Sequence, residues 1–365
     1  EQSRGPLIHA LMGYEFVVLY PINPRTLAKY REAFRISRAK DDPTDAALWM
    51  ELVRKHRDKR RAWKPEDEPT RLLGRLVEDR RKAVNWRTRL SNQLTAALKD
   101  YFPQALELVG EELASTLACD FLRKWPTLEA VQKVRPEIVR TFYYGHNCRR
   151  GDWIETRLKL ISEANALTSD AAIIESSVMK VPMLVRQLRS LIGDIHKYDQ
   201  KLAEIFPQHP DAPLFESLPG AGAVLAPRLL TAFGSDRSRY ESAADVQPYV
   251  GIAPVTQRSG KSETVHWRWG CPKFLRQSFH EFAGQSVCFS AWAQAYYQQP
   301  LHKGNSHHQA LRSLAFKWIR IIYRCWQNRT PYCEATYLQS LQKRGSPLFK
   351  SIAQTPESAP QSACA

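Results

Sequence analysis

The sequence predicts a fold of the class α/β plus mostly α, in which one small α/β part precedes long helices. Three patterns support this class. Phe16 to Tyr20 is a short apolar, β-branched run closed by prolines, which is typical of a buried strand. From Ile173 to Phe206, apolar residues recur every three or four positions, as in a bundle or coiled-coil helix. Residues 274–297 and 308–326 also have helical spacing.

The composition indicates a globular protein with a polyanionic partner. The chain has 365 residues, of which 43% are hydrophobic, so two or three domains with real cores are expected. Its 53 Lys and Arg against 37 Asp and Glu give a net charge of +16, which favours nucleic acid as the partner. Neither an apolar run of membrane-spanning length nor a signal peptide is evident, so we expect a soluble bacterial protein of the cytoplasm, associated with the nucleoid and not with a membrane.

Prolines punctuate the chain and suggest its division. Pro182 predicts a kink or a break in the long helix near Lys180. Pro207, Pro210 and Pro213 mark a boundary close to residue 210. We expect domains at 1–110, 111–210 and 211–345. A disordered tail is expected at 346–365, which is rich in Ser, Pro, Ala and Gln.

The segment Leu218-Pro219-Gly220-Ala221-Gly222 predicts a helix-hairpin-helix turn that binds phosphate. Glycines at Gly220 and Gly222 permit backbone N–H groups to approach an anion, and the start of the next helix adds unpaired donors. A glycine-rich turn without a ligand is the alternative. Pro227, inside the following apolar run, should kink or delay that helix.

Ser259 lies between Arg258 and Lys261 and is followed by Gly260. No imidazole and carboxylate are spaced near it as in a protease-like triad, whereas the two cations suit a phosphodiester. A serine ester to a DNA phosphate is therefore one interpretation. The other is a flexible polar loop from Thr256 to Glu263 that joins two packed elements.

The segment after this loop alternates in polarity. Val265, Trp267 and Trp269 fall on one side, and His266 and Arg268 on the other, which predicts a strand with one apolar face. Stacking of the tryptophans on bases is the alternative. We assign Arg268 to the predicted nucleic-acid contacts, together with Gly220, Gly222, Arg258 and Lys261.

Asp42 and Asp45 are three residues apart at the start of a predicted helix and would share one face, so their carboxylates could hold a divalent cation. Helix capping is the alternative: Asp42 would be the N-cap, Pro43 the first helical residue and Asp45 the third.

Two basic stretches suit a nucleic-acid backbone. Residues 55–89 are dense in Lys and Arg with Trp63 and Trp86 interleaved, although nearby acids favour a solvated helix face as the alternative. The predicted helix 308–326 carries four further cations, namely Arg312, Lys317, Arg320 and Arg324. The seven cysteines lack close paired spacing, so they are expected to be reduced thiols rather than zinc ligands or a disulfide framework.

The order of these motifs resembles the insertion-sequence one-ten type transposases, also known as bridge-RNA-guided recombinases. The resemblance rests on KDDPTDA, the long central helix, LPGAGAVLAPRLLTAFG, YVGIAPVTQRSGK and a basic helical end, and covers nearly the whole chain up to about Pro347. It implies a partial RuvC/RNase H-like DEDD domain at 1–110, a coiled-coil-like middle and a C-terminal serine transposase domain with a helix-hairpin-helix.

The resemblance also implies the catalytic residues. Glu1 matches the family's Glu, and Asp42 and Asp45 match the last acidic motif, so all three would hold Mg²⁺. No residue matches the family's first Asp, and the chain is therefore expected to be truncated at its N-terminus and of doubtful activity. Ser259 matches the family's serine and would form the covalent link to a DNA phosphate.

The partners implied are DNA, a guide RNA and further copies of the chain in a dimer or tetramer, with the carboxylates and the serine of one site coming from different subunits. Two other functions remain open at this point. One is a nucleic-acid-binding remnant without catalysis, and the other is a RuvC-like nuclease without serine chemistry.

Overall fold

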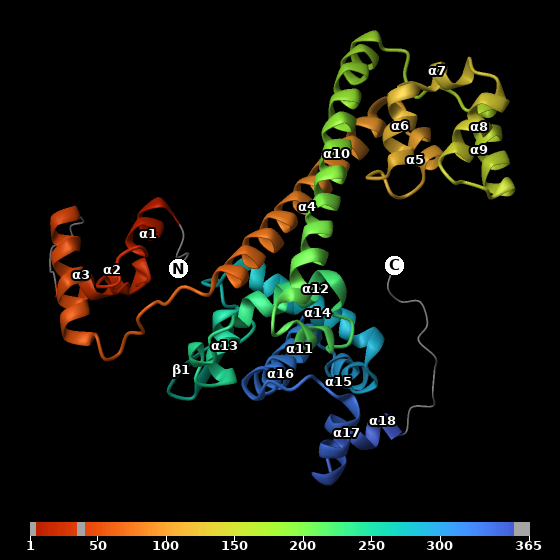
Figure 1. Ribbon diagram of the computed structural model, residues 1–365. Helices are drawn as coiled ribbons and strands as arrows, with labels where there is room; N and C mark the ends of the chain where they lie inside the picture. The colour runs from red at the N-terminus through yellow and green to blue at the C-terminus, as the bar shows by residue number, and fades with distance from the viewer. Residues whose placement is uncertain (1–4, 35–40, 354–365) are drawn as a thin grey trace. The chain divides into compact units, whose positions relative to one another are not determined.

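The computed structural model describes residues 5–34 and 41–353, and the remaining positions lie outside the described residues. The chain divides into two compact units, Glu1–Asp67 and Glu68–Ala365, which are considered separately below. Both are mostly helical (Figure 1). The domain limits expected from the sequence, at residues 110 and 210, stay predictions.

The described residues of the first unit form three helices, α1 (Pro6–Leu11), α2 (Pro24–Phe34) and α3 (Asp42–His56). The strand predicted at residues 16–20 is wrong: the segment makes only an isolated bridge between Leu19 and Trp63, whose N–H donates to the Leu19 carbonyl at 2.7 Å. Phe16 is 83% exposed. A strand needs a ladder partner to satisfy its backbone, and the described part of this unit supplies a single contact.

Two long antiparallel helices, α4 (Glu68–Tyr101) and α10 (Ala171–Ile205), run through the second unit and pack along each other. The direction is evident from the ion pair between Arg80, early in α4, and Asp199, late in α10. Figure 1 shows the pair in orange and green. The helical periodicity found in the sequence is thus confirmed.

Of the kink or break predicted near Lys180, the break does not occur, because α10 continues through Pro182. Proline removes one backbone hydrogen bond and crowds the preceding turn, at a cost of roughly 3 kcal/mol. Burial of Val181, Leu184 and Val185 on both sides of that turn supplies compensating packing. The helix instead ends before Pro207, as the sequence predicted.

The far ends of α4 and α10 close one hydrophobic core together with five short helices. These are α5 (Gln104–Val109), α6 (Thr116–Lys124), α7 (Leu128–Gln132), α8 (Pro136–Gly145) and α9 (Gly151–Glu163). Phe121 and Tyr143 are fully buried in it, and the Tyr143 hydroxyl donates to the Leu108 carbonyl at 2.9 Å.

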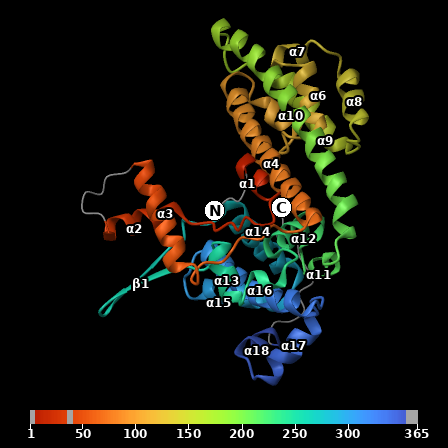
Figure 2. The same cartoon turned by 60° about the vertical axis from the view of Figure 1, so that its left-hand side comes forward.

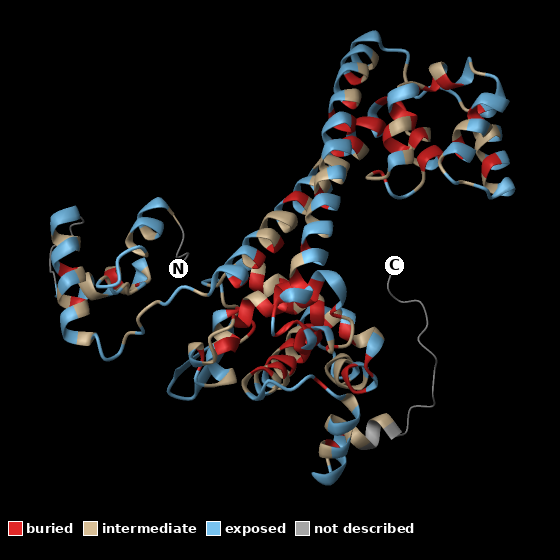
Figure 3. Cartoon of the chain, viewed as in Figure 1, coloured by how far each residue is buried: buried red, intermediate tan, exposed pale blue. Residues whose placement is uncertain are grey.

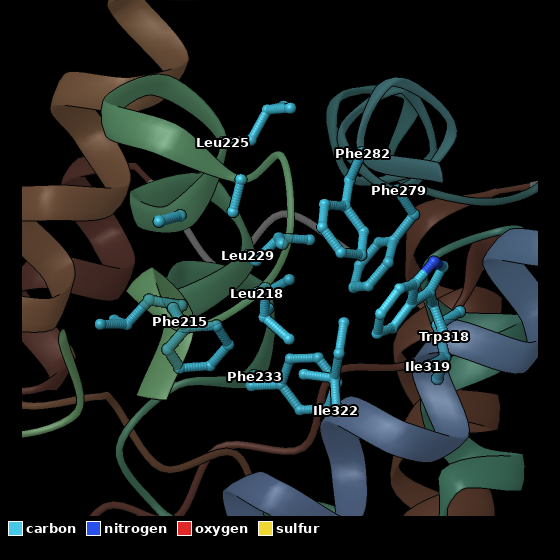
Figure 4. Close-up of a cluster of buried hydrophobic side chains, with 14 of the residues drawn as sticks. Phe215, Leu218, Leu225, Leu229, Phe233, Phe279, Phe282, Trp318, Ile319 and Ile322 are labelled. Carbon is cyan, nitrogen blue, oxygen red and sulfur yellow. The ribbon is translucent and has the colours of Figure 1, made fainter. Parts of the chain in front are cut away.

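The near ends of α4 and α10 join a second, larger core, in which red buried residues concentrate in Figure 3. It is built from α11 (Ala212–Glu216), α12 (Gly222–Phe233), α13 (Ala243–Tyr249), α14 (Lys273–Phe289), α15 (Ala291–His302), α16 (His307–Asn328), α17 (Glu334–Lys343) and α18 (Pro347–Ala353). Phe279, Phe282 and Trp318 meet at its centre (Figure 4). This core supports the hairpin described below.

Two helical predictions need correction here. The helix expected at 274–297 is divided at Ser290 into α14 and α15, whereas the one at 308–326 is confirmed as α16. The tail expected to be disordered from residue 346 is helical at 347–353, because Leu348 is buried in the core. Residues 354–365 lie outside the described residues.

Five cysteines are free thiols, namely Cys119, Cys148, Cys271, Cys325 and Cys333. Cys288 is disulfide-bonded, so the expectation of reduced thiols is wrong for that residue. No helix within the described ranges combines the length and the hydropathy required to cross a bilayer.

Candidate active site

Ser259 lies at the tip of an antiparallel hairpin made of β1 (Val255–Ser259) and β2 (Ser262–His266). Ser259 pairs with Ser262, so Gly260 and Lys261 form a two-residue turn. Gly260 has φ of 57°, the positive value that such a turn demands and that glycine adopts without strain. The loop predicted at Thr256–Glu263 is therefore an ordered hairpin.

The hairpin extends away from the helices of its unit, as Figure 2 shows. Every residue from Thr256 to His266 is exposed. The Ser259 hydroxyl is consequently open to a ligand as large as a nucleic-acid strand.

The two cations beside Ser259 differ in their surroundings. Arg258 lies opposite Glu263 in the strand register, and its Nε donates to the Glu263 carboxylate at 2.9 Å. Lys261 is exposed and forms no ion pair with any residue that the structure describes. Because an exposed ion pair contributes at most about 1 kcal/mol, a phosphate can displace Glu263 from Arg258.

The apolar strand face predicted after Ser259 is wrong. β2 ends at His266, and Val265 and Trp269 are 62% and 75% exposed, because a two-stranded hairpin has no second layer to cover that face. Of the three apolar residues predicted on this face, only Trp267 is half-buried. Arg268 holds the base of the hairpin: its Nε donates to the Ala253 carbonyl at 3.0 Å.

The two glycines of the predicted phosphate-binding turn have different roles. Gly220 has φ of 76°, and a Cβ there would lie within 3.0 Å of Phe289 and of the Gln285 backbone in α14, so its conformation and close packing require glycine. Gly222 has φ of 52° and nothing within 4 Å of an added Cβ. Only Gly222, at the start of α12, therefore lies on an open surface. α12 continues through Pro227 without delay.

The acidic pair belongs to the first unit and differs from the predicted capping arrangement. Asp41, not Asp42, is the N-cap of α3 and accepts the Thr44 N–H at 2.8 Å. Asp42 is the exposed first residue of the helix. Asp45 is half-buried, and Arg31 Nε donates to its carboxylate at 2.9 Å. Glu1, the third predicted ligand, lies outside the described residues.

These carboxylates do not form a metal centre in the part of the chain that is described. No group of three or more His, Cys, Asp or Glu side chains gathers among those residues. Asp42 and Asp45 supply two carboxylates, and one is already neutralised by Arg31. A cation would have to displace that guanidinium before it could reach the Asp45 carboxylate.

Removing the true cap should destabilise α3. We expect Asp41→Ala to lower the free energy of unfolding of the first unit by about 1 kcal/mol, because the Thr44 N–H loses its acceptor. Asp41→Asn retains an acceptor and should cost little. Asp42→Ala is the matched loss of charge and should cost less than Asp41→Ala. Hydrogen exchange of the α3 amides measures all three, and a larger effect of Asp42→Ala would contradict the assignment.

The sequence did not predict that three side chains meet at the base of the hairpin. The Trp267 ring has Arg276 of α14 and Arg312 of α16 against it, with guanidinium carbons 4.7 and 4.2 Å from the ring centre. The sequence contains one signal for this arrangement, an arginine four positions from a histidine on each of two predicted helices. These pairs are Arg276 with His280 and Arg312 with His308.

Two families of known proteins match parts of this chain. Residues 212–298, which contain the turn, the hairpin and α14, match the family described as Transposase IS116/IS110/IS902 family. Residues 1–103 match a second family, the DEDD transposase domain of IS110 elements, described as Transposase. Members of the DEDD family typically depend on a metal.

Similar proteins come from bacterial insertion elements. A protein of Streptomyces coelicolor designated a mini-circle transposase for IS117 is 27% identical, over 92% of this chain and 81% of its own length. Uncharacterized proteins of insertion element IS110 from the same organism and of IS116 from Streptomyces clavuligerus are 24% and 26% identical. They cover 80% and 87% of this chain and 72% and 78% of their own lengths, respectively.

The two family matches occur in the expected order, with the acidic motif in the first and Ser259 in the second. The similarity to whole insertion-element proteins extends across both. The chain belongs to the IS110/IS116/IS902 family of insertion-element transposases, enzymes that cut and rejoin DNA.

Proposed function

We propose that this transposase rejoins DNA through a covalent intermediate on Ser259. The observation that carries the proposal is the position of the Ser259 hydroxyl, at the exposed tip of an ordered hairpin and between two cations. The Ser259 Oγ attacks a DNA phosphorus, the hydroxyl proton passes to solvent, and the bond to one deoxyribose oxygen breaks. That oxygen takes up a proton and leaves as a free hydroxyl.

Rejoining reverses the same exchange. A deoxyribose hydroxyl of the second strand attacks the phosphoserine ester, forms the new phosphodiester and releases the Ser259 hydroxyl. One phosphate ester is exchanged for another in each step, so no external energy source is needed. Arg258 and Lys261 stabilise the negative charge that develops on the phosphate oxygens.

The hairpin places no imidazole beside Ser259, because His266 lies at the opposite end of the strands, paired with Val255. Its acidic residue, Glu263, is held by Arg258 across the strands. We propose that Asp42, Asp45 and Glu1 supply carboxylates and bind Mg²⁺ once Arg31 is displaced from Asp45, and that these residues come from another subunit of a dimer or tetramer. A guide RNA as the selector of DNA sequence also remains part of the proposal.

Adduct mapping tests the serine step. The protein is incubated with duplex DNA and Mg²⁺, with and without RNA from the element, and is then denatured and digested with protease and nuclease. We expect mass spectrometry to find a nucleotide attached to Ser259, within the peptide Ser259-Gly260-Lys261. Strand cleavage without any protein–DNA adduct would instead favour hydrolysis at the acidic residues, and a nucleotide on another residue would refute the assignment.

A further inference from the structure

A cluster of cations without acidic partners lies where the base of the serine hairpin meets α14 and α16. The two helices pack against each other, with Arg276 and His280 one turn apart on α14 and His308 and Arg312 one turn apart on α16. The Trp267 ring contacts both guanidinium groups, at 4.7 Å for Arg276 and 4.2 Å for Arg312. The Trp267 indole therefore interacts with two guanidinium groups of like charge.

Histidines extend this cluster along the helices. The His280 and His308 ring centres are 5.4 Å apart, and those of His307 and His308 are 5.2 Å apart. His307 and His308 are exposed in the first turn of α16, where the positive end of the helix dipole adds to the field. His307 Nδ1 lies 2.6 Å from the Tyr297 hydroxyl.

No carboxylate offsets these charges among the described residues. Arg276 donates to the Arg268 carbonyl at 3.1 Å, and neither it nor Arg312 forms an ion pair there. Glu281, the neighbouring acid on α14, is instead engaged by Arg228 at 2.6 Å and by Arg81 at 3.3 Å.

Burial and neighbouring positive charges both lower pKa values within the cluster. Burial, followed by the charge of Arg276, lowers the pKa of Arg312. Burial lowers the pKa of His280, and His308, Arg312 and His307 lower it further. An anion at this position would relieve the repulsion and favour the charged histidines.

We propose that this Trp267 cluster, comprising Trp267, Arg276, His280, His307, His308 and Arg312, binds the phosphodiester backbone of a nucleic-acid strand at the base of the serine hairpin. Two half-buried guanidinium groups held against one indole ring can together supply the paired donors that suit phosphate oxygens. Trp267 holds both of them in position before binding. The inference rests on the proposed function and deepens it by assigning a strand-holding site at the opposite end of the hairpin from Ser259. It concerns binding and not the covalent step.

Fluorescence anisotropy with the full chain tests the site. Labelled duplex DNA and a labelled RNA hairpin are titrated at several salt concentrations with the wild type and with Arg276→Gln/Arg312→Gln. The matched control is Arg149→Gln/Arg150→Gln, which removes two exposed arginines just before α9. We expect the first pair to weaken binding at least tenfold and to lower the salt slope by about two. The control should change Kd less than threefold.

Each outcome is decisive. Weakening confined to DNA or confined to RNA identifies the strand, whereas equal losses in the two variants, or no loss in Arg276→Gln/Arg312→Gln, overturn the proposal. A melting temperature equal to that of the wild type shows that a variant is folded. If Arg276→Gln/Arg312→Gln melts at a lower temperature, Trp267→Leu replaces it as the test, because it removes the indole platform but no charge. Trp267→Leu should weaken binding several-fold. Ser259→Ala should bind normally, so failure of the covalent step and failure of this site are distinguishable.

The pH dependence of binding gives a second readout. Because the pKa of His280 is lowered in the free protein, phosphate binding should return it toward its usual value and take up a proton. Affinity should therefore rise as pH falls from about 7.5 to 5.5, through the ordinary histidine range. The rise should be smaller in His280→Gln than in His196→Gln, which changes an exposed histidine on α10. Equal rises in both would overturn the histidine part of the site.

Discussion

Ser259→Ala is expected to abolish the covalent protein–DNA adduct and to lower the rate of strand exchange by several orders of magnitude. Alanine removes the oxygen that forms the ester, while the hairpin keeps its register and its two cations. Loss of a serine nucleophile costs about 10⁶ in rate in a well-studied hydrolase. Adduct yield on a denaturing gel and a strand-exchange assay measure the two effects.

Ser262→Ala provides the matched control. Ser262 is the exposed cross-strand partner of Ser259 on the same hairpin, so its removal changes the local surface to a similar extent. It should leave both the adduct and the exchange rate close to wild type. If the adduct persists in Ser259→Ala and disappears in Ser262→Ala, the nucleophile is the other hydroxyl.

Trp318→Ala is expected to cost about 3–5 kcal/mol of unfolding free energy in the second unit. Trp318 is fully buried on α16, in contact with Phe282 and Trp292, with ring centres 5.2 and 4.6 Å away. Its Nε1–H donates to the Ser286 hydroxyl at 2.8 Å. The substitution leaves a large cavity between α14, α15 and α16, and denaturant unfolding measures the loss.

Trp318→Phe separates the ring from its hydrogen bond. Phenylalanine retains most of the buried aromatic surface, so its cost should be clearly smaller and should arise from the lost indole donor and the reduced volume. Equal destabilisation by the two substitutions would contradict the view that packing dominates at this position. A change in strand exchange without any loss of stability would assign Trp318 a role beyond the core.

The helical composition and the position of the serine turn follow from local patterns. Apolar spacing over 173–206 and 308–326 identifies α10 and α16, since a buried stripe on a helix recurs every three to four residues. Gly260 and Lys261 between polar, extended residues are compatible with a two-residue hairpin turn, because glycine occupies the first central position, where φ is positive. The motifs around Ser259 and the two aspartates were sufficient to suggest the transposase family.

Elements that depend on distant partners could not be predicted in this way. The run at 16–20 has strand propensity but makes a single bridge, and Pro182 sits within a helix because packing against α4 outweighs its local cost. Ser290 ends one helix and begins another within a single apolar pattern. Propensity describes a residue and its near neighbours, whereas burial is decided by the whole core.

The sequence by itself determined that the chain is basic and mostly helical, and that it carries a serine between two cations. Only the tertiary structure decided that Asp41 rather than Asp42 caps α3 and that Asp45 pairs with Arg31. It also decided that Arg276 and Arg312 both lie against the Trp267 ring. These side chains are separated along the chain, and their electrostatic interactions depend on distances that folding alone establishes.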